Sequence, residues 1–231
     1  MNYILIIITA IAIAIMLAVI FKLNPKKNQE LVKNEKLNSI AKKFPSNVEI
    51  CKSILRILKN ETVRIEKNED ARDCLYIAIT NKIVIAGKQD NFTRIQTIAH
   101  ECLHSVQDRR IQIANFIISN ICILYFIAML VLGVLKLLPD KMLFLVIYIL
   151  LVFCSFVVRS YLENDAMFKA KQLAKEYMKE ENVCSKEEID MLIDGFEQIN
   201  DNGIKGYNYS LFMGIIARIV ILAIVFLVKF I

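Results

Sequence analysis

The chain has 231 residues, of which 56% are hydrophobic and 23% are charged, and its formal net charge is +6. This apolar content exceeds that of an ordinary soluble domain, whereas the charged fraction excludes a bundle made only of membrane helices. Charged segments that alternate with membrane spans would account for both values. The basic residues gather near the ends of the apolar stretches, and no DNA- or RNA-binding motif is present, so we expect membrane topology and not nucleic acid to explain the charge.

The first apolar stretch runs from Tyr3 to Phe21. About 20 residues cross the core of a bilayer, so its length predicts a membrane helix. No basic region precedes it and lysines follow it, which favours an uncleaved anchor over a signal peptide. Three further apolar stretches predict spans at Ala114 to Leu135, Met142 to Val158 and Tyr209 to Phe230.

The polar segment after the first span predicts helices followed by short strands. Gln29 to Lys43 and Asn47 to Leu58 have the periodicity of amphipathic helices, with Pro45 between them. Three strands are expected at Val63 to Glu66, Leu75 to Thr80 and Lys82 to Ala86. A helix that begins near Thr93 should pack on the small antiparallel sheet formed by these strands. The edge of such a sheet can pair with an extended peptide.

Only two histidines occur in the chain, and both lie in one short motif. His100 and His104 are four positions apart, and Glu101 follows the first of them, which is the HExxH pattern. Positions i and i+4 share one face of a helix, so both imidazoles can reach a single metal ion. Glu101 then projects toward the ion without ligating it, where it can deprotonate a water molecule. We predict a site for one zinc ion; two helix histidines with purely structural roles are the alternative.

A catalytic zinc ion usually has three protein ligands, so the motif needs one more. Glu163 is the best third ligand, because it follows the third span and an even number of crossings separates it from the motif. Asp165 is its main competitor, and a solvated carboxylate is the other interpretation of Glu163. Gln107 and Asp108 could accept the second ring N–H of a ligating histidine, although surface or capping roles are equally open to them.

The distribution of basic residues predicts the side on which the motif lies. Lysines follow the first span, Arg109 and Arg110 precede the second, and Arg159 follows the third. With four crossings these residues share one side, and the positive-inside rule makes that side cytosolic, with both termini outside. The six cysteines show no CxxC spacing, which fits reduced thiols in the cytosol.

The C-terminal part of the chain predicts a capped helix, a turn and the last span. Ser185 and Glu188 predict a capping box that opens a helix ending at Gln198, and residues 201–203 predict a turn. Arg218 lies inside the last span and should face protein or a wet cavity, or extend to the interface. The sequence does not rank the candidates for an oxyanion partner, which are Arg159, Tyr161, Tyr207 and Tyr209.

The motif and the later carboxylate resemble a known family. His-Glu-Cys-Leu-His-Ser-Val-Gln at residues 100–107, followed by a membrane hairpin and then by Glu-Asn-Asp-Ala at 163–166, is similar to the YugP-type membrane zinc metallopeptidases and, more distantly, to HtpX-like peptidases. The similarity spans roughly residues 75–173. It implies that His100, His104 and Glu163 bind zinc, that Glu101 is the catalytic base, and that the membrane is a bacterial plasma membrane.

We therefore predict an α+β membrane protein with four transmembrane helices and a mostly helical, zincin-like cytosolic domain that carries a small sheet. Its segments would be an anchor (1–22), a metallopeptidase segment with the HExxH helix (23–110), a transmembrane hairpin (111–158), a helical segment with the third ligand (159–208) and a last transmembrane helix (209–231). The expected reaction is hydrolysis of peptide bonds in polypeptides or membrane proteins at the cytosolic surface. A zinc-binding scaffold, and a zinc hydrolase of lipids or small amides, are the alternatives.

Overall fold

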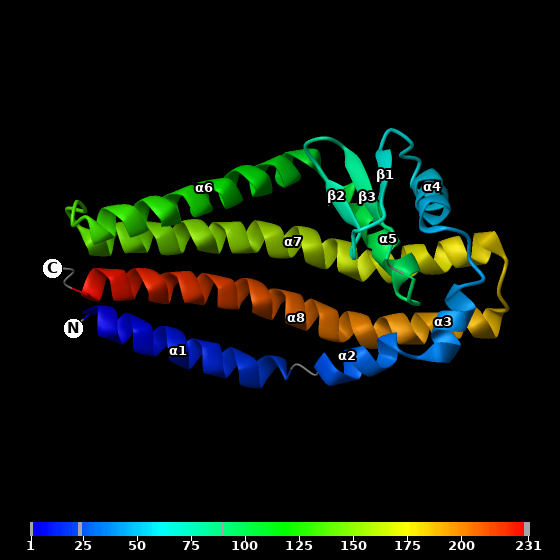
Figure 1. Ribbon diagram of the computed structural model, residues 1–231, viewed down its shortest axis with the longest axis horizontal. Coiled ribbons are helices and arrows are strands. Elements are labelled where there is room, and N and C mark those ends of the chain that lie inside the picture. Colours follow the sequence, from blue (N-terminus) through cyan, green and yellow to red (C-terminus); the bar gives the residue numbers. More distant parts are fainter. Residues whose placement is uncertain (1, 23–24, 89, 229–231) are drawn as a thin grey trace. The chain divides into compact units, whose positions relative to one another are not determined.

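The computed structural model describes residues 2–22, 25–88 and 90–228. Helices make up most of it, and a small sheet is inserted between them (Figure 1). The chain divides into two compact units. The first contains Met1–Leu23, Ala114–Tyr161 and Lys205–Ile231, and the second contains Asn24–Ile113 and Leu162–Ile204.

Within the described residues, four helices are long and apolar enough to cross a membrane, as the sequence predicts. They are α1 (Asn2–Phe21), α6 (Arg109–Val134), α7 (Lys141–Glu181) and α8 (Lys186–Leu227). Large apolar side chains stand exposed along them, including Leu124 at 67% and Leu150 at 60%. A helix satisfies its own backbone hydrogen bonds and can present such a surface to lipid. The first unit is therefore compatible with a multi-pass membrane protein.

The prediction of a turn at residues 201–203 is wrong, because α8 continues through them without a break. Gly203 lowers the helix propensity only modestly, and a Cβ at that position would meet nothing within 4 Å. Side-chain hydrogen bonds hold the surrounding turns in place. Asn200 donates to the backbone carbonyl of Met167 at 3.1 Å, and Asn202 donates to the side-chain oxygen of Asn28 at 3.1 Å. These tertiary contacts outweigh the local turn signal.

The second unit contains a three-stranded sheet in the order β1-β3-β2. Its strands are β1 (Arg64–Asn68), β2 (Leu75–Ile77) and β3 (Lys82–Ala86). The prediction of an antiparallel sheet is wrong in part: β2 pairs with β3 antiparallel, but β1 pairs with β3 parallel. β3 therefore lies between the two strands that precede it in the chain, parallel to β1 and antiparallel to β2. Asn81, with φ 48°, supplies the left-handed residue that the turn into β3 requires.

The second unit also contains several short helices. The single helix expected at residues 29–43 is two helices, α2 (Pro25–Val32) and α3 (Glu35–Ala41), because the side chain of Asn34 accepts the backbone N–H of Leu37 and starts the second one. Ser46 and Glu49 form a capping box that opens α4 (Asn47–Ile57). The helix that carries the histidines is α5 (Arg94–His104), next to its expected start at Thr93.

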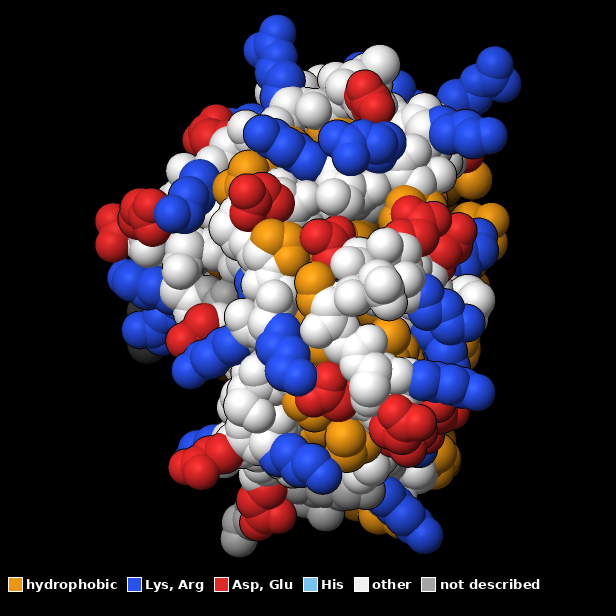
Figure 2. All heavy atoms as spheres, turned by 90° about the vertical axis from the view of Figure 1, so that its right-hand side faces the viewer, with side chains coloured by type: hydrophobic (Ala, Val, Ile, Leu, Met, Phe, Trp, Pro, Cys, Tyr) orange, Lys and Arg blue, Asp and Glu red, His pale blue; other side chains and the backbone are white. Residues whose placement is uncertain are grey.

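The core of the second unit lies where α4, α5 and α7 meet the sheet. Its fully buried side chains include Ile54 of α4, Ile83 and Ile85 of β3, Ile98 of α5 and Ala166 of α7. The outer surface carries acidic and basic side chains in alternation (Figure 2). Ion pairs join Lys43 to Glu188 at 2.6 Å, Lys171 to Glu197 at 3.2 Å and Lys175 to Asp190 at 3.1 Å. Exposed pairs of this kind contribute little to stability, so the apolar core holds α5 in place.

Candidate metal centre

Arg94 anchors the first turn of α5. Its guanidinium is buried and donates four hydrogen bonds of 2.8–2.9 Å to the carbonyls of Ala41, Phe44 and Pro45 and to the side-chain oxygen of Asn47. These acceptors belong to the link between α3 and α4. A guanidinium with five donors in a fixed plane suits such a cluster of carbonyls. The helix with the histidines is thereby fastened to the rest of the second unit at its start.

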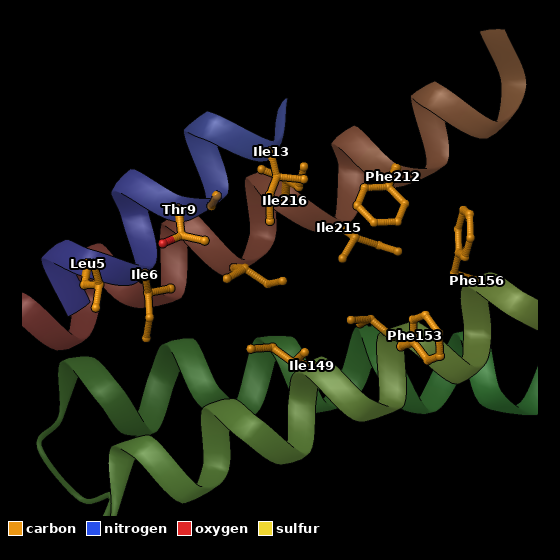
Figure 3. A pocket seen from close by; sticks show the side chains of 13 residues that line it. Leu5, Ile6, Thr9, Ile13, Ile149, Phe153, Phe156, Phe212, Ile215 and Ile216 are labelled. Atoms are coloured by element: carbon orange, nitrogen blue, oxygen red, sulfur yellow. The ribbon is translucent and has the colours of Figure 1, made fainter. Parts of the chain in front are cut away.

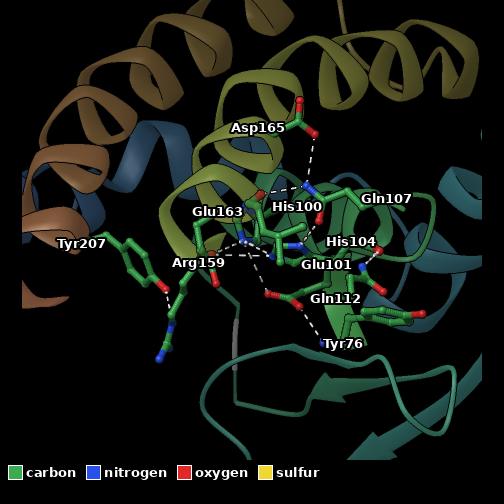
Figure 4. Close-up of polar contacts among 11 residues, drawn as sticks. Tyr76, His100, Glu101, His104, Gln107, Gln112, Arg159, Glu163, Asp165 and Tyr207 are labelled. Atoms are coloured by element: carbon green, nitrogen blue, oxygen red, sulfur yellow. Dashed lines mark hydrogen bonds and ion pairs between the residues drawn. The ribbon is translucent and has the colours of Figure 1, made fainter. Parts of the chain in front are cut away.

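His100, His104 and Glu163 come together at one point (Figure 4). The two Nε2 atoms lie 3.1 Å apart, and Oε2 of Glu163 lies 3.4 Å from Nε2 of His100 and 3.6 Å from Nε2 of His104. The three side chains retain 14–22% of their exposure, so the cluster is sheltered and still reachable from outside. This group could hold a metal ion.

The buried face of α7 directs Glu163 toward the histidines. Leu162, Ala166, Ala170 and Leu173 follow helical spacing and are all buried, with at most 6% exposure, and the last three belong to the core of the second unit. Glu163 lies beside this stripe and therefore at the edge of the packed face. The carboxylate can then reach across to both imidazoles.

Charge is balanced inside the cluster. Burial acts to raise the pKa of Glu163, but hydrogen bonds from His100 and His104 outweigh it and hold that pKa well below its usual range. Burial acts to lower the pKa of His104, yet its hydrogen bonds to Glu163 and Gln107 leave it raised. An ionised carboxylate and basic imidazoles form an arrangement that a cation can enter once protons leave.

Glu101 is buried next to the cluster and is anchored from the opposite side. Its Oε2 accepts the backbone N–H of Tyr76 in β2 at 2.6 Å, while its Oε1 lies 4.0 Å from Nε2 of His100 (Figure 4). Only 8% of the residue is exposed, and burial raises the pKa of its carboxyl. One oxygen is thus fixed to the sheet and the other faces the histidines. The contribution of Tyr76 is not predictable from the sequence, because a backbone donor leaves no residue signature.

Gln107 connects the two elements that supply the cluster. Its Oε1 lies 2.8 Å from Nδ1 of His104, and its amide nitrogen donates to the backbone carbonyl of Leu162 at 2.7 Å and to Asp165 at 3.1 Å. If Nε2 of His104 faces an ion, Nδ1 carries the proton and donates to Gln107. Gln107 would then orient the ring and hold α7 against α5.

The structure separates the other two candidates from the ion-binding position. Asp165 pairs with Lys169 at 2.5 Å and accepts from Gln107, and it is not part of the three-residue group. Asp108 accepts the backbone N–H of Arg110 at 2.8 Å in the first turn of α6. Its observed role is therefore to cap a helix.

The candidate oxyanion partners all belong to the first unit. Nε of Arg159 donates to the hydroxyl of Tyr207 at 2.8 Å, and the ring of Tyr209 packs edge-on against Phe21 with centroids 6.0 Å apart. Tyr161 is 59% exposed. These contacts are structural, and none of them ranks one candidate above another.

Comparison of the chain with models of known protein families, with curated proteins and with solved structures found no match. Its geometry therefore carries what can be concluded about this centre: two histidines and a glutamate that could hold a metal ion, beside a buried carboxylate.

Proposed function

We propose that the protein is a membrane-embedded, zinc-dependent metallopeptidase of the YugP type, with Glu101 as its general base. The observation that carries the proposal is the position of Glu101, which is buried beside the ion-binding group without belonging to it. A purely structural metal site has no need of such a carboxylate. This distinction favours an enzyme over a zinc-binding scaffold.

The dimensions of the cluster fit zinc. A tetrahedral ion with bonds of about 2.0–2.2 Å keeps its ligand atoms about 3.3–3.6 Å apart. Two of the three distances here, 3.4 and 3.6 Å, lie in this range, and the 3.1 Å between the two histidine nitrogens is slightly shorter. Two imidazoles and one carboxylate also form a ligand set of catalytic zinc, in which the fourth position is left for water or substrate. Zinc held there would act as a Lewis acid that polarises a peptide carbonyl and acidifies a water molecule.

The protein's own contribution is proton transfer by Glu101. Burial raises the pKa of Glu101 toward neutral pH, and a group whose pKa lies near the working pH can both accept and release a proton. The hydrogen bond from Tyr76 fixes one oxygen, so the free oxygen faces the histidines. We propose that this oxygen takes a proton from the attacking water and passes it to the departing amine. A positioned base of this kind contributes about 10²–10⁴-fold to the rate.

An extended polypeptide is the substrate that suits the surroundings. β2 is the outer strand of the sheet, and its partner β3 occupies only one of its sides. On the side of β2 that has no strand partner, the backbone N–H of Tyr76 donates to Glu101. A peptide that adds to this edge would therefore lie along the strand that anchors the base. A lipid offers no such backbone, which favours peptide bonds over lipid esters or small amides.

Chain connectivity supports hydrolysis near a membrane surface. Glu163 follows Val158, the end of the third apolar stretch, by five residues of a continuous helix, or about 7.5 Å of rise. α6 begins at Arg109, five residues after His104. Both ligand-bearing segments are thus tied closely to apolar helices, and the basic residues near them favour the cytosolic side of the membrane. The family resemblance implies that this membrane is a bacterial plasma membrane.

Two variants test this proposal in detergent-purified protein. Glu101→Gln should bind zinc in a 1:1 ratio, as the wild type does, and lose peptidase activity. Glu163→Gln should lose both zinc and activity, because the amide keeps the shape of the side chain but removes the charged carboxylate ligand. Activity is measured on a peptide library and, separately, on phospholipids and small amides. Unchanged turnover by Glu101→Gln would contradict the mechanism, and zinc retained at wild-type affinity by Glu163→Gln would contradict the ligand set.

A further inference from the structure

Two arginines line a small polar cavity inside the first unit. Arg159 of α7 and Arg218 of α8 surround a volume of about 80 Å³, together with Ser119 of α6 and Ser155 of α7. The two serine hydroxyl oxygens lie 3.4 Å apart. Arginine within an apolar span is costly, and such residues mark binding or transport sites when they face a cavity. Arg218 lies well inside the last apolar stretch, so its charge needs a partner.

The sequence of the first unit offers little negative charge to neutralise the two arginines. Its segments hold a single acidic residue, Asp140. This carboxylate accepts the backbone N–H groups of Met142 and Leu143 at 3.0 Å each and so caps the start of α7. Arg159 lies at the other end of the same apolar run. Among the described residues, no carboxylate lines the cavity that the two arginines share.

An apolar cavity adjoins the polar one. It encloses about 420 Å³ between α1, α7 and α8, within the range of about 300–1,000 Å³ that is typical of ligand sites (Figure 3). Its lining is aliphatic and aromatic apart from Thr9. Val152, Phe156 and Ile215 line both cavities, so the polar cavity and the apolar cavity meet at these three side chains.

We propose that this composite cavity binds an anionic phospholipid, with the phosphate against Arg159 and Arg218 and an acyl chain in the apolar part. Guanidinium groups bind phosphate through paired N–H donors, and the serine hydroxyls can add further hydrogen bonds. Arg159 uses its Nε toward Tyr207 and keeps its terminal nitrogens for such a ligand. Basic pockets between membrane helices bind anionic headgroups in the same way. A free phosphate would leave the apolar cavity empty, whereas a lipid fills both parts.

Native mass spectrometry of the full-length protein in detergent tests the proposal. Phosphatidylglycerol and phosphatidylcholine with identical acyl chains are titrated in parallel. The wild type should retain phosphatidylglycerol preferentially. Arg218→Gln should lower that affinity about five- to tenfold and leave phosphatidylcholine unaffected. Lys141→Gln removes the same charge at the opposite end of the α7 span and serves as the matched control, which should keep wild-type affinity.

A second variant tests the apolar part. Ala10 lines the large cavity on α1, and Ala10→Phe should fill it and weaken the binding of both lipids without changing the preference between them. Size-exclusion profiles and the zinc content of each variant report folding. If Arg218→Gln does not fold, Arg159→Gln replaces it in the comparison.

Three results would overturn the proposal. Equal affinity of the wild type for the two lipids would remove the role of charge, and an equal loss in Lys141→Gln would remove the role of this cavity. Displacement of phosphatidylglycerol by millimolar inorganic phosphate, or by a peptide with acidic side chains, would identify a different anion as the ligand. Glu101→Gln should bind lipid as the wild type does, so the outcome is independent of the proposed peptidase activity.

Discussion

The backbone N–H of Tyr76 donates to Oε2 of Glu101 at 2.6 Å, which ties the buried carboxylate of the HExxH helix to the outer strand of the sheet. One oxygen of Glu101 is thereby held while the other faces His100. The orientation of the proposed base thus depends on β2 as much as on its own helix. A peptide that pairs with β2 would therefore lie next to the hydrogen bond between Tyr76 and Glu101.

Removing that donor should disorient the base. Tyr76→Pro deletes the N–H, and Tyr76→Ala keeps it while losing the same side chain, including its hydroxyl bond to Asn81. The proline variant should therefore lose at least about tenfold more activity than the alanine variant, since hydrogen bonds to charged groups contribute about 1.5–3 kcal/mol. Steady-state rates and their pH profiles check this. Equal rates in the two variants would show that the N–H does not position Glu101.

Gln107 should control metal affinity through His104. Gln107→Ala removes the partner of Nδ1 and both bonds to the α7 segment, so zinc affinity should fall about 10–100-fold. Asp108→Ala, which removes a helix cap in the adjacent position, is the control and should leave affinity within about twofold of wild type. Competition with a fluorescent chelator measures both. A similar loss in the two variants would point to a general disturbance of the loop.

Arg94 should be among the most sensitive positions of the second unit. Arg94→Met removes four hydrogen bonds to a cluster of carbonyls and one amide oxygen, so the free energy of unfolding should fall by about 3 kcal/mol or more. Arg56→Met removes an exposed pair with Glu61, whose atoms are 3.9 Å apart, and should change stability by less than about 0.5 kcal/mol. Denaturant unfolding in detergent compares them. Equal stability of the two variants would contradict the anchoring role.

Stability should decline in alkaline solution because of a buried thiol. Burial raises the pKa of Cys74 to about 11. An unfolded thiol has a pKa of about 8.5, so the stabilising contribution is complete below that pH and is lost as the pH rises toward 11. This thiol should account for roughly 3 kcal/mol of the loss, so stability should decline by about that much less in Cys74→Ala.

Thermal unfolding between pH 8 and 11 measures this effect. Cys154→Ala removes an exposed cysteine of an apolar helix and should keep the wild-type slope. If Cys74→Ala keeps that slope as well, the alkaline loss has another source.

Several parts of the fold follow from local sequence patterns. The four apolar helices are recognisable because about 20 consecutive apolar residues have few other stable environments. The bounds of α4, α5 and β3 are also close to those expected, because caps and alternation are properties of neighbouring residues. The sheet topology was not predictable in this way. The parallel pairing of β1 with β3 depends on where residues distant in sequence meet.

The sequence by itself determined that two histidines one helical turn apart can share a metal ion, and the topology favoured Glu163 over Asp165 as the third ligand. Only the tertiary structure decided how they are supported: the N–H of Tyr76 on Glu101, the amide of Gln107 between His104 and α7, and the four bonds of Arg94. The identity of a ligand is a property of one residue and its spacing. Its orientation depends on long-range packing and on backbone donors that any residue type can supply, so no local pattern records it.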